Sequence, residues 1–564
     1  MNRESYSRIP PVGAFALALA QALALWLLHQ AIEDQTWPAT NAGLLLGVYL
    51  VVIFVPLTLL VLWSLRSKNI LWLSTVAMGI FLLWTASKSF IDLNSLGLSI
   101  ALDEDRIAGF LLPWTIAWLI TLPMLRTGLE TTLTHMPYSA LFRNTWRSYL
   151  TLAESALFTG VFWLLLLLWA ALFQTLGNDF FRMIFTDQRF AYPATTLTFA
   201  AATQLIGQKD RFIDGVLDQV LGLLKWLLPL AGIIVVVFSL ALLPKLPSLV
   251  VSQERIVDSA ILLALVAATL LLFNAAYREG GVEPGYGHLL QQALRVVPPL
   301  LTLIALTALY SVGLRWLDVG LTPPRYWGLV TAIFAALYSM GYAYASVRTG
   351  PWMQAIQKVN RNVSAILLAT LLLSLTPIAD PLRLSVASQL QRALNAETAD
   401  TQTSALVFLR FESGQLGRKA LDDISSGRSL ASSPDRVMTL RSQAAEIAGL
   451  GEKPLTTLVN DLEDAIARYP IWRAKLEVIP VETVIPPSLE DALRTEFMRS
   501  PSANKWQDND PSPSLAFLDL DGDSTNEAIL FFGSTGGSSS YLKSYRVFRL
   551  SDDHWQPLSS GSLR

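Results

Sequence analysis

The chain reads GVFWLLLLLWAALF at Gly160–Phe173 and GIIVVVFSLALL at Gly232–Leu243, with no charged side chain in either run. A helix needs roughly twenty residues to cross the hydrocarbon of a bilayer, which is about 30 Å thick, and both runs lie inside apolar segments of that size. The sequence therefore predicts an all-α polytopic transmembrane helical bundle of about ten helices in residues 1–382. The segments are Pro11–Ile32, Gly43–Leu65, Ile70–Ser87, Ile107–Leu125, Thr151–Leu176, Gly222–Leu243, Ile256–Tyr277, Leu290–Leu314, Tyr326–Val347 and Val363–Leu382.

The composition agrees with a membrane protein. The chain has 564 residues, of which 52% are hydrophobic and 15% charged, and these averages combine a very apolar first two-thirds with a polar last third. A formal net charge of −2 gives no reason to expect nucleic acid as a partner, since a nucleic-acid binder needs a concentrated basic face. With no cysteine, the chain has no disulfides, thiolate metal sites or thiol catalysis.

Lysine and arginine in the short loops predict the orientation. Arg3 and Arg8 precede the first segment, and Arg66 and Lys68 follow the second, whereas Glu33–Ala42 contains neither residue type. Because basic loops stay in the cytoplasm, the amino terminus is predicted to be cytoplasmic and Glu33–Ala42 to lie outside.

Ala191–Gly207 leaves the side of the carboxyl-terminal region open. Its polarity favours a re-entrant or interfacial helix over a span. With ten spans the carboxyl-terminal region lies in the cytoplasm, and with eleven spans it lies outside. With ten spans, Lys209 and Arg211 fall in an outside loop, so the second half is poorly oriented.

Four stretches resemble the bacterial domain-of-unknown-function 4153 membrane protein family. They are Tyr138–Gly177, LLKWLLPLAG at Leu223–Gly232, RWLDVGLTPPRYWGLVTAIFAALYSMGYAYA at Arg315–Ala345, and Asp380–Leu421. The resemblance covers most of residues 1–425. It implies a multi-pass protein of the bacterial inner membrane and carries over no catalytic residue.

Polar residues within the apolar segments favour helix packing over chemistry. Gln21, His29, Gln204 and Asn274 are predicted to bond across helices, which is the common role of such groups in lipid. The tyrosines of Tyr338–Tyr344 are likewise assigned mainly to packing, with an aromatic substrate cradle as the alternative.

The turn Gly320–Arg325 carries capping signals. Gly320 ends one helix, Thr322 is predicted to cap the next, and Arg325 to anchor it at the headgroups.

Catalytic motifs are missing from the sequence. It contains no zinc-type histidine spacing, no GxSxG, no GxxxxGK[ST] and no GxGxxG after a strand. The interpretation therefore leans away from an enzyme.

Beyond residue 382 the composition is that of a soluble α+β domain. Residues 383–490 are predicted to be mainly helical, and residues 491–564 to form a small β unit. The predicted helices are Ser385–Asn395, Ser404–Ser425, Pro434–Gly449 and Leu455–Ala467; the strands are Leu515–Leu518, Ala528–Phe532, Tyr541–Leu550 and a run around Trp555.

An acidic loop in the β unit carries the clearest metal signal. The side chains of Asp519, Asp521, Asp523 and Glu527 and the carbonyl of Thr525 match the alternating oxygen ligands that calcium prefers. The series resembles the DxDGDxxxE calcium loop of FG-GAP and VCBS-like repeats, although Ser524 replaces the usual glycine. The alternative is an acidic β-turn without an ion. A weak calcium site suits the outside of the cell, which conflicts with ten spans.

Two function classes remain. In the first, the bundle is transport-related and a calcium-stabilised tail regulates it. In the second, the bundle is a scaffold or sensor that anchors a soluble interaction module. A cavity at mid-membrane, lined by discontinuous helices, would favour the first class.

Overall fold

The structure is a computed structural model that describes residues 12–89, 104–132, 136–207, 210–251, 258–278, 285–348, 353–396, 398–426, 444, 469, 472–480, 485–499, 512–520, 525–534, 542–551 and 554–563. The chain divides into two compact units, Met1–Ala448 and Gly449–Arg564. The predicted helices 434–449 and 455–467 fall outside the described residues, Ala444 apart.

Nine helices among the described residues are long and apolar enough to cross a membrane, which confirms the predicted class of polytopic helical protein. They are α1 (Val12–Glu33), α2 (Ala42–Val61), α3 (Asn69–Ser89), α4 (Glu104–Glu130), α5 (Tyr138–Thr175), α8 (Asp210–Leu242), α10 (Ser259–Tyr277), α11 (His288–Leu294) joined to α12 (Val297–Val319), and α13 (Pro323–Val347). The remaining helices of this unit are α6 (Phe180–Thr186), α7 (Gln188–Gly207), α9 (Leu246–Val251), α14 (Ile356–Ser374), α15 (Pro381–Asn395), α16 (Ala399–Phe411) and α17 (Gly414–Ser425).

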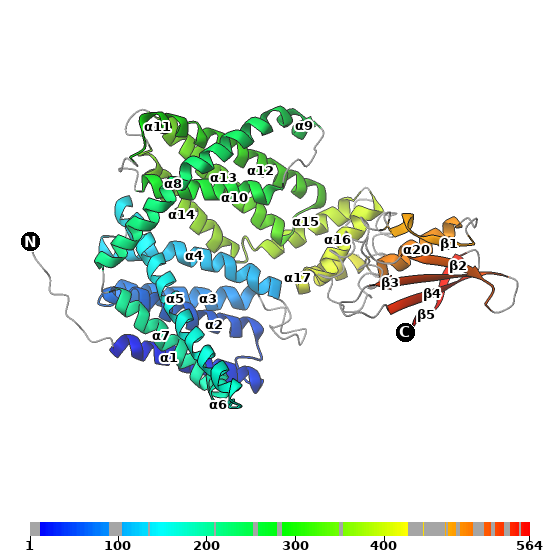
Figure 1. Ribbon diagram of the computed structural model, residues 1–564, viewed down its shortest axis with the longest axis horizontal. Coiled ribbons are helices and arrows are strands. Elements are labelled where there is room, and N and C mark those ends of the chain that lie inside the picture. Colours follow the sequence, from blue (N-terminus) through cyan, green and yellow to red (C-terminus); the bar gives the residue numbers. More distant parts are fainter. Residues whose placement is uncertain are drawn as a thin grey trace, which may run out of the picture. The chain divides into compact units, whose positions relative to one another are not determined.

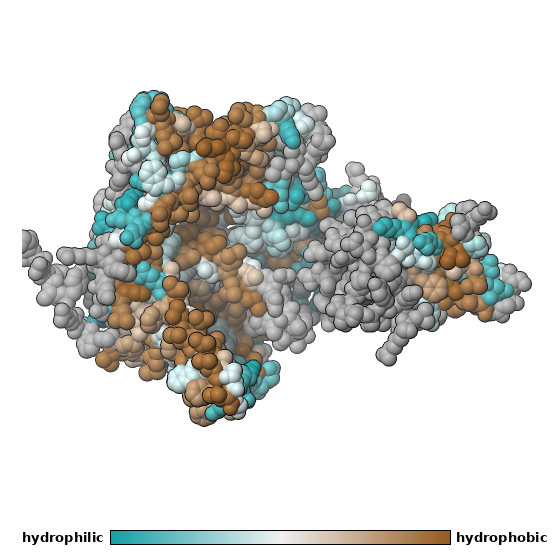
Figure 2. All heavy atoms as spheres, viewed as in Figure 1, coloured by the Kyte–Doolittle hydropathy of each residue, from teal (hydrophilic) through white to brown (hydrophobic). Residues whose placement is uncertain are grey.

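Most of the described bundle surface on the face that Figure 2 shows is apolar. A soluble protein rarely exposes apolar patches of this extent, whereas lipid tails cover them at no cost. Exposed large side chains on α5 and α8 include Leu157, Phe158, Leu164, Leu165, Leu168, Leu172, Leu223, Leu227, Leu230, Ile233 and Val237.

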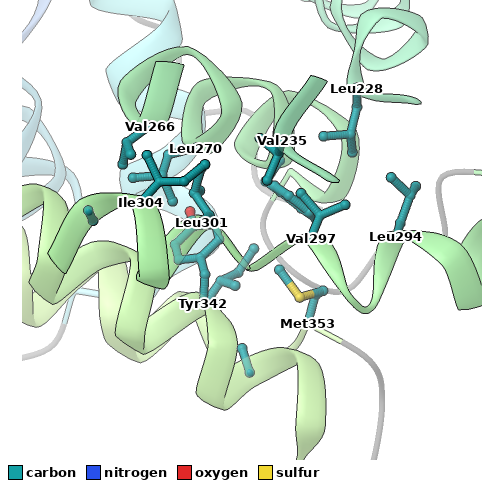
Figure 3. Packing of buried hydrophobic residues seen from close by; sticks show 14 of the residues in the cluster. Leu228, Val235, Val266, Leu270, Leu294, Val297, Leu301, Ile304, Tyr342 and Met353 are labelled. Carbon is teal, nitrogen blue, oxygen red and sulfur yellow. The ribbon is translucent and has the colours of Figure 1, made fainter. Parts of the chain in front are cut away.

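Two apolar clusters hold the helices together. One cluster joins α2, α3 and α4 through Leu50, Phe54, Leu82 and Trp118. The other joins α8, α10, α12 and α13; Figure 3 shows Tyr342 surrounded by its aliphatic side chains. The helices of each cluster run side by side in Figure 1.

Helix α7, which contains Ala191–Gly207, runs along α1 in the opposite direction. Ala200 near its end packs with Ala14 and Ala18 at the start of α1. Near its beginning, the Tyr192 ring lies 6.1 Å from the ring of His29, close to the end of α1. Both helices therefore cover the same depth of the bundle.

Helix α14 runs along α13 in the same antiparallel way. Three hydrogen-bonded pairs connect the two helices: Tyr326 with Ser374 at 2.6 Å, Tyr338 with Ser364 at 2.8 Å, and Tyr342 with Asn360 at 3.0 Å. The predicted segment Val363–Leu382 was placed too late, since α14 begins with the polar sequence IQKVNRN and ends at Ser374. This polar start explains why α14 is not among the nine apolar helices.

Side chains of α15 cap the carbonyls at the end of α12. Gln389 Nε2 donates to Val319 O at 3.0 Å, and Arg392 Nη1 donates to the same oxygen at 2.8 Å. Gly320 has a φ of 78°. A Cβ at this glycine would lie 2.6 Å from Gln389 Nε2, so the turn requires glycine. Partial burial lowers the pKa of the Arg392 guanidinium, and Asp318 opposes this shift.

The α12–α13 turn differs from its prediction in two side chains. Thr322 occupies the N-cap position of α13, but its side chain makes no capping hydrogen bond. Arg325 Nη1 donates to Gly320 O at 3.2 Å, so its guanidinium caps α12 from within the protein.

The predicted helix Ser404–Ser425 is divided into α16 and α17. Ser413 Oγ donates to Phe408 O at 2.7 Å, and Gly414 adopts a φ of 58°. This hydrogen bond and the left-handed glycine end α16 and turn the chain.

The second unit contains a five-stranded sheet in the order β1-β2-β3-β4-β5. Its elements are β1 (Glu477–Ile479), α20 (Pro487–Arg499), β2 (Ser514–Leu518), β3 (Glu527–Ser534), β4 (Leu542–Ser551) and β5 (His554–Leu563). β1 pairs with β2 in parallel, whereas the strands from β2 to β5 pair antiparallel with one another. These last four strands confirm the predicted strands. Trp472 and Phe497 pack with Leu515, Leu530 and Phe548 in its core.

Candidate functional site

A cavity of about 640 Å³ lies between α4, α5, α10, α13 and α14. Its volume falls in the usual range for small-molecule sites. A hollow with apolar walls opens on the side of the bundle in Figure 2, in the region where Figure 1 places α4, α10 and α14. The opening therefore faces the side of the helices that lipid tails would contact.

The cavity walls are apolar and uncharged. None of the described residues that line it is Asp, Glu, Lys, Arg or His. Lining side chains from all five helices include Leu112, Ile116, Trp146, Leu263, Leu271, Trp327, Leu367 and Leu371.

A hydrogen-bonded polar cluster lies at one end of this apolar space, centred on Asn360. Asn360 Nδ2 donates to the Tyr138 hydroxyl and to Asn274 Oδ1, both at 2.7 Å. Asn360 Oδ1 accepts a hydrogen bond from the Tyr342 hydroxyl. Asn360 is 9% exposed and Tyr342 fully buried, so the cluster also joins α5, α10, α13 and α14 inside the bundle.

The cluster and the apolar walls occupy different depths. Tyr138 is the first residue of α5, and Asn360 lies just inside the start of α14. Leu371 lines the cavity eleven positions after Asn360, which corresponds to about 16 Å along the helix. The cavity is therefore polar at one face of the bundle and apolar toward the other.

Sequence reasoning found part of this cluster. The predicted bond across helices is confirmed for Asn274, and for Gln204, whose Nε2 donates to Leu60 O at 3.3 Å. His29 instead contacts Glu33 of its own helix at 3.2 Å. Asn360 was missed because the last apolar segment was started at Val363. The signal was the asparagine within the polar first turns of α14.

The tyrosines of α13 have two roles. Tyr342 is buried in the packing between helices, as the sequence indicated. Tyr338 lines the cavity and pairs with Ser364. Gly341 permits the close approach of α14, because a Cβ there would lie 2.4 Å from Val359 Cγ1.

The acidic loop joins β2 to β3 in the second unit. Asp519 and Thr525 are exposed, whereas Asp521 and Asp523 lie outside the described residues. Glu527 is 2% exposed; its Oε2 accepts from Leu520 N at 2.8 Å and its Oε1 from Arg549 Nε at 3.2 Å. The Glu527 carboxylate at the start of β3 thus connects the end of β2 with β4. No group of three metal-type side chains occurs within the described residues.

Comparisons with known proteins found no match. No protein-family model matches the chain, and neither do curated proteins nor solved structures.

Proposed function

We propose that this chain is a bacterial inner-membrane protein whose helical bundle binds a lipid-like molecule and is transport-related. The observation that carries the proposal is the laterally open, apolar cavity with a polar cluster at one end. A lipid can enter such a cavity from the bilayer without crossing water.

The cavity wall favours an amphipathic molecule over a water-soluble solute. A hydrated ion or sugar loses its water on entering an apolar space, and the lining offers few groups to replace it. Coupled ion transport also uses buried ionisable residues, which the described lining lacks. An acyl or isoprenoid chain has no such cost.

The same cavity favours the transport-related class over a scaffold, because a scaffold needs no internal space. Its lining helices are continuous, in contrast to the expected discontinuous helices. We therefore propose that a lipid moves along the open side of the bundle. This differs from transporters that bind an ion between discontinuous helices.

Eleven crossings follow if α7 and α14 span the membrane beside α1 and α13. Their antiparallel contacts along most of the length of these neighbours support this count. An odd number of crossings leaves α15 on the face opposite to the start of α1. We call the face where α1 begins the N-terminal face.

Basic residues support a cytoplasmic N-terminal face under this count. Under this count Arg211, at the start of α8, lies at the N-terminal face. The excess of lysine and arginine on that face therefore extends to the second half of the bundle. Described basic residues near this face are Arg66, Lys68, Arg126, Arg143, Arg147, Arg211, Arg278, Arg295, Arg348, Lys358 and Arg361; near the opposite face they are Lys88, Arg106, Arg182, Arg189, Lys245, Arg315 and Arg325. The tail from α15 onward is therefore proposed to lie outside the cytoplasm.

Calcium remains a proposal for the acidic loop. An external location suits a weak calcium site. Glu527 does not fit as a calcium ligand while its carboxylate accepts hydrogen bonds from Arg549 Nε and Leu520 N. The proposal therefore rests on Asp519, Asp521, Asp523 and the Thr525 carbonyl.

Photo-crosslinking of the full-length protein in lipid nanodiscs tests lipid binding. Neutral and anionic lipids with a diazirine on the acyl chain should label residues of α4, α13 and α14 that line the cavity. Ala267→Trp fills the cavity from α10 and should remove most of this labelling. Ala268→Trp, at an exposed neighbouring position that does not line the cavity, should leave it unchanged. Equal labelling in both variants would contradict the proposal.

A further inference from the structure

We infer that the polar end of the bound lipid is uncharged, as in a long-chain alcohol or a diacylglycerol, and lies at the N-terminal face. The inference rests on the proposed function and assigns the groups that recognise the polar end: Asn274 and the Tyr338–Ser364 pair. All three residues line the cavity.

The missing charge in the wall selects against an ionised headgroup. A phosphate that leaves water needs a cation to replace its hydration, and the described lining residues provide none. A hydroxyl or ester carbonyl needs only one or two hydrogen bonds, which hydroxyl and amide groups supply.

Asn360 fixes the orientation of Asn274. Because Asn360 Nδ2 donates to Asn274 Oδ1, the Asn274 amide oxygen is turned toward Asn360. One N–H of Asn274 Nδ2 serves Leu270 O at 3.2 Å. The Asn274 side chain also hydrogen-bonds the Tyr342 hydroxyl. Asn274 Oδ1 can accept a second hydrogen bond beside that from Asn360, and this acceptor remains for a ligand hydroxyl.

Tyr338 and Ser364 supply the complementary groups. Their two hydroxyls share one hydrogen bond of 2.8 Å. One hydroxyl proton and several lone pairs therefore remain for a ligand. Together with Asn274, this pair offers both donors and acceptors to the polar end of a ligand in the cavity.

The position of these groups orients the lipid. Asn274 lies near the end of α10 and Tyr338 in the second half of α13, which both belong to the N-terminal side of the cavity. The apolar wall from Leu367 to Leu371 continues toward the opposite face. The tail therefore points away from the N-terminal face, as it does in the leaflet on that side.

Two matched probes test the headgroup in nanodiscs that contain the full-length protein. A diacylglycerol and a phosphatidic acid carry the same diazirine acyl chain and differ only in the phosphate. We expect the diacylglycerol to label the cavity at least about tenfold more strongly, because burial of an unpaired charge is costly.

Two hydroxyl deletions test the assigned residues. Tyr338→Phe removes one ligand-facing hydroxyl and should lower diacylglycerol labelling by about fivefold. Tyr326→Phe is the control, because it deletes the same kind of tyrosine–serine bond between α13 and α14 at residues that do not line the cavity. It should leave labelling unchanged.

The outcomes separate this inference from the proposed function. Equal or stronger cavity labelling by phosphatidic acid overturns the uncharged headgroup while lipid binding stands. Equal losses in Tyr338→Phe and Tyr326→Phe, or no loss in Tyr338→Phe, overturn the assigned residues. If neither probe labels the cavity in the wild-type protein, the proposed function itself fails.

Discussion

Asn360 in the bundle and Glu527 in the sheet are both buried polar side chains, but different groups stabilise them. Asn360 makes three hydrogen bonds to uncharged partners on three other helices. Glu527 forms an ion pair with Arg549 and accepts a backbone N–H. A bundle surrounded by lipid favours uncharged groups, whereas a unit in water can form an ion pair whose arginine remains partly hydrated. The contrast is the one expected for a bundle in lipid and a unit in water, and the bundle's own buried arginine, Arg126, pairs with Glu130 close to the end of α4.

An all-or-none labelling experiment tests whether the regions also face different compartments. In the cysteine-free chain, Thr36→Cys and Thr403→Cys should both react with an impermeant thiol reagent in intact cells, because eleven crossings place both outside. Ser67→Cys should react only after lysis. All three positions are exposed. Protection of Thr403→Cys together with labelling of Thr36→Cys would restore an even number of crossings.

Removal of the arginine partner should give the largest stability change. Arg549→Met leaves Glu527 buried without a cation, and we expect the opening free energy of the β3 amides to fall by about 3 kcal/mol. Hydrogen exchange of the full-length protein measures this value. The double variant Glu527→Leu with Arg549→Met should recover much of the loss. A single variant as stable as wild type would show that the pair is dispensable.

Calcium should stabilise the same strand pair if the acidic loop binds it. At a hundredfold excess over the dissociation constant, binding to the folded state adds about 2.7 kcal/mol. Slower hydrogen exchange in β2 and β3 would report this gain in the full-length protein. Asp521→Asn or Asp523→Asn should abolish the gain, because each removes a carboxylate from the loop. Identical exchange in calcium and in chelator would leave the acidic β-turn as the explanation.

The uncharged cluster in the bundle should give the smallest change. Asn360→Ala should cost about 1 kcal/mol, since hydrogen bonds between helices in membranes contribute little individually. Asn360→Asp should cost more, because an ionised carboxylate at that position has no cation among its bonded partners. Thermal unfolding in detergent compares the two variants. A less stable Asn360→Ala than Asn360→Asp would contradict the assignment of solvent.

Sequence reasoning located most helices but not the site. Apolar runs such as Gly160–Phe173 predict membrane helices directly, because length and hydropathy are local properties. Asn360 and Tyr138 are far apart in the chain and meet only through helix packing. Neither residue belongs to a motif, so local patterns could not predict the cluster.

The sequence by itself determined the polytopic class, nine of its ten predicted segments, which match helices of spanning length among the described residues, and the last four strands, because each follows from a local pattern of apolar residues. Only the tertiary structure showed that α7 and α14 run antiparallel along α1 and α13. Their polar residues weaken the local signal, but contacts with α1 and α13 replace lipid around them. The cavity and the pairing of Glu527 with Arg549 were likewise decided by packing. Both join segments that lie apart in the sequence, and only folding brings such segments into contact.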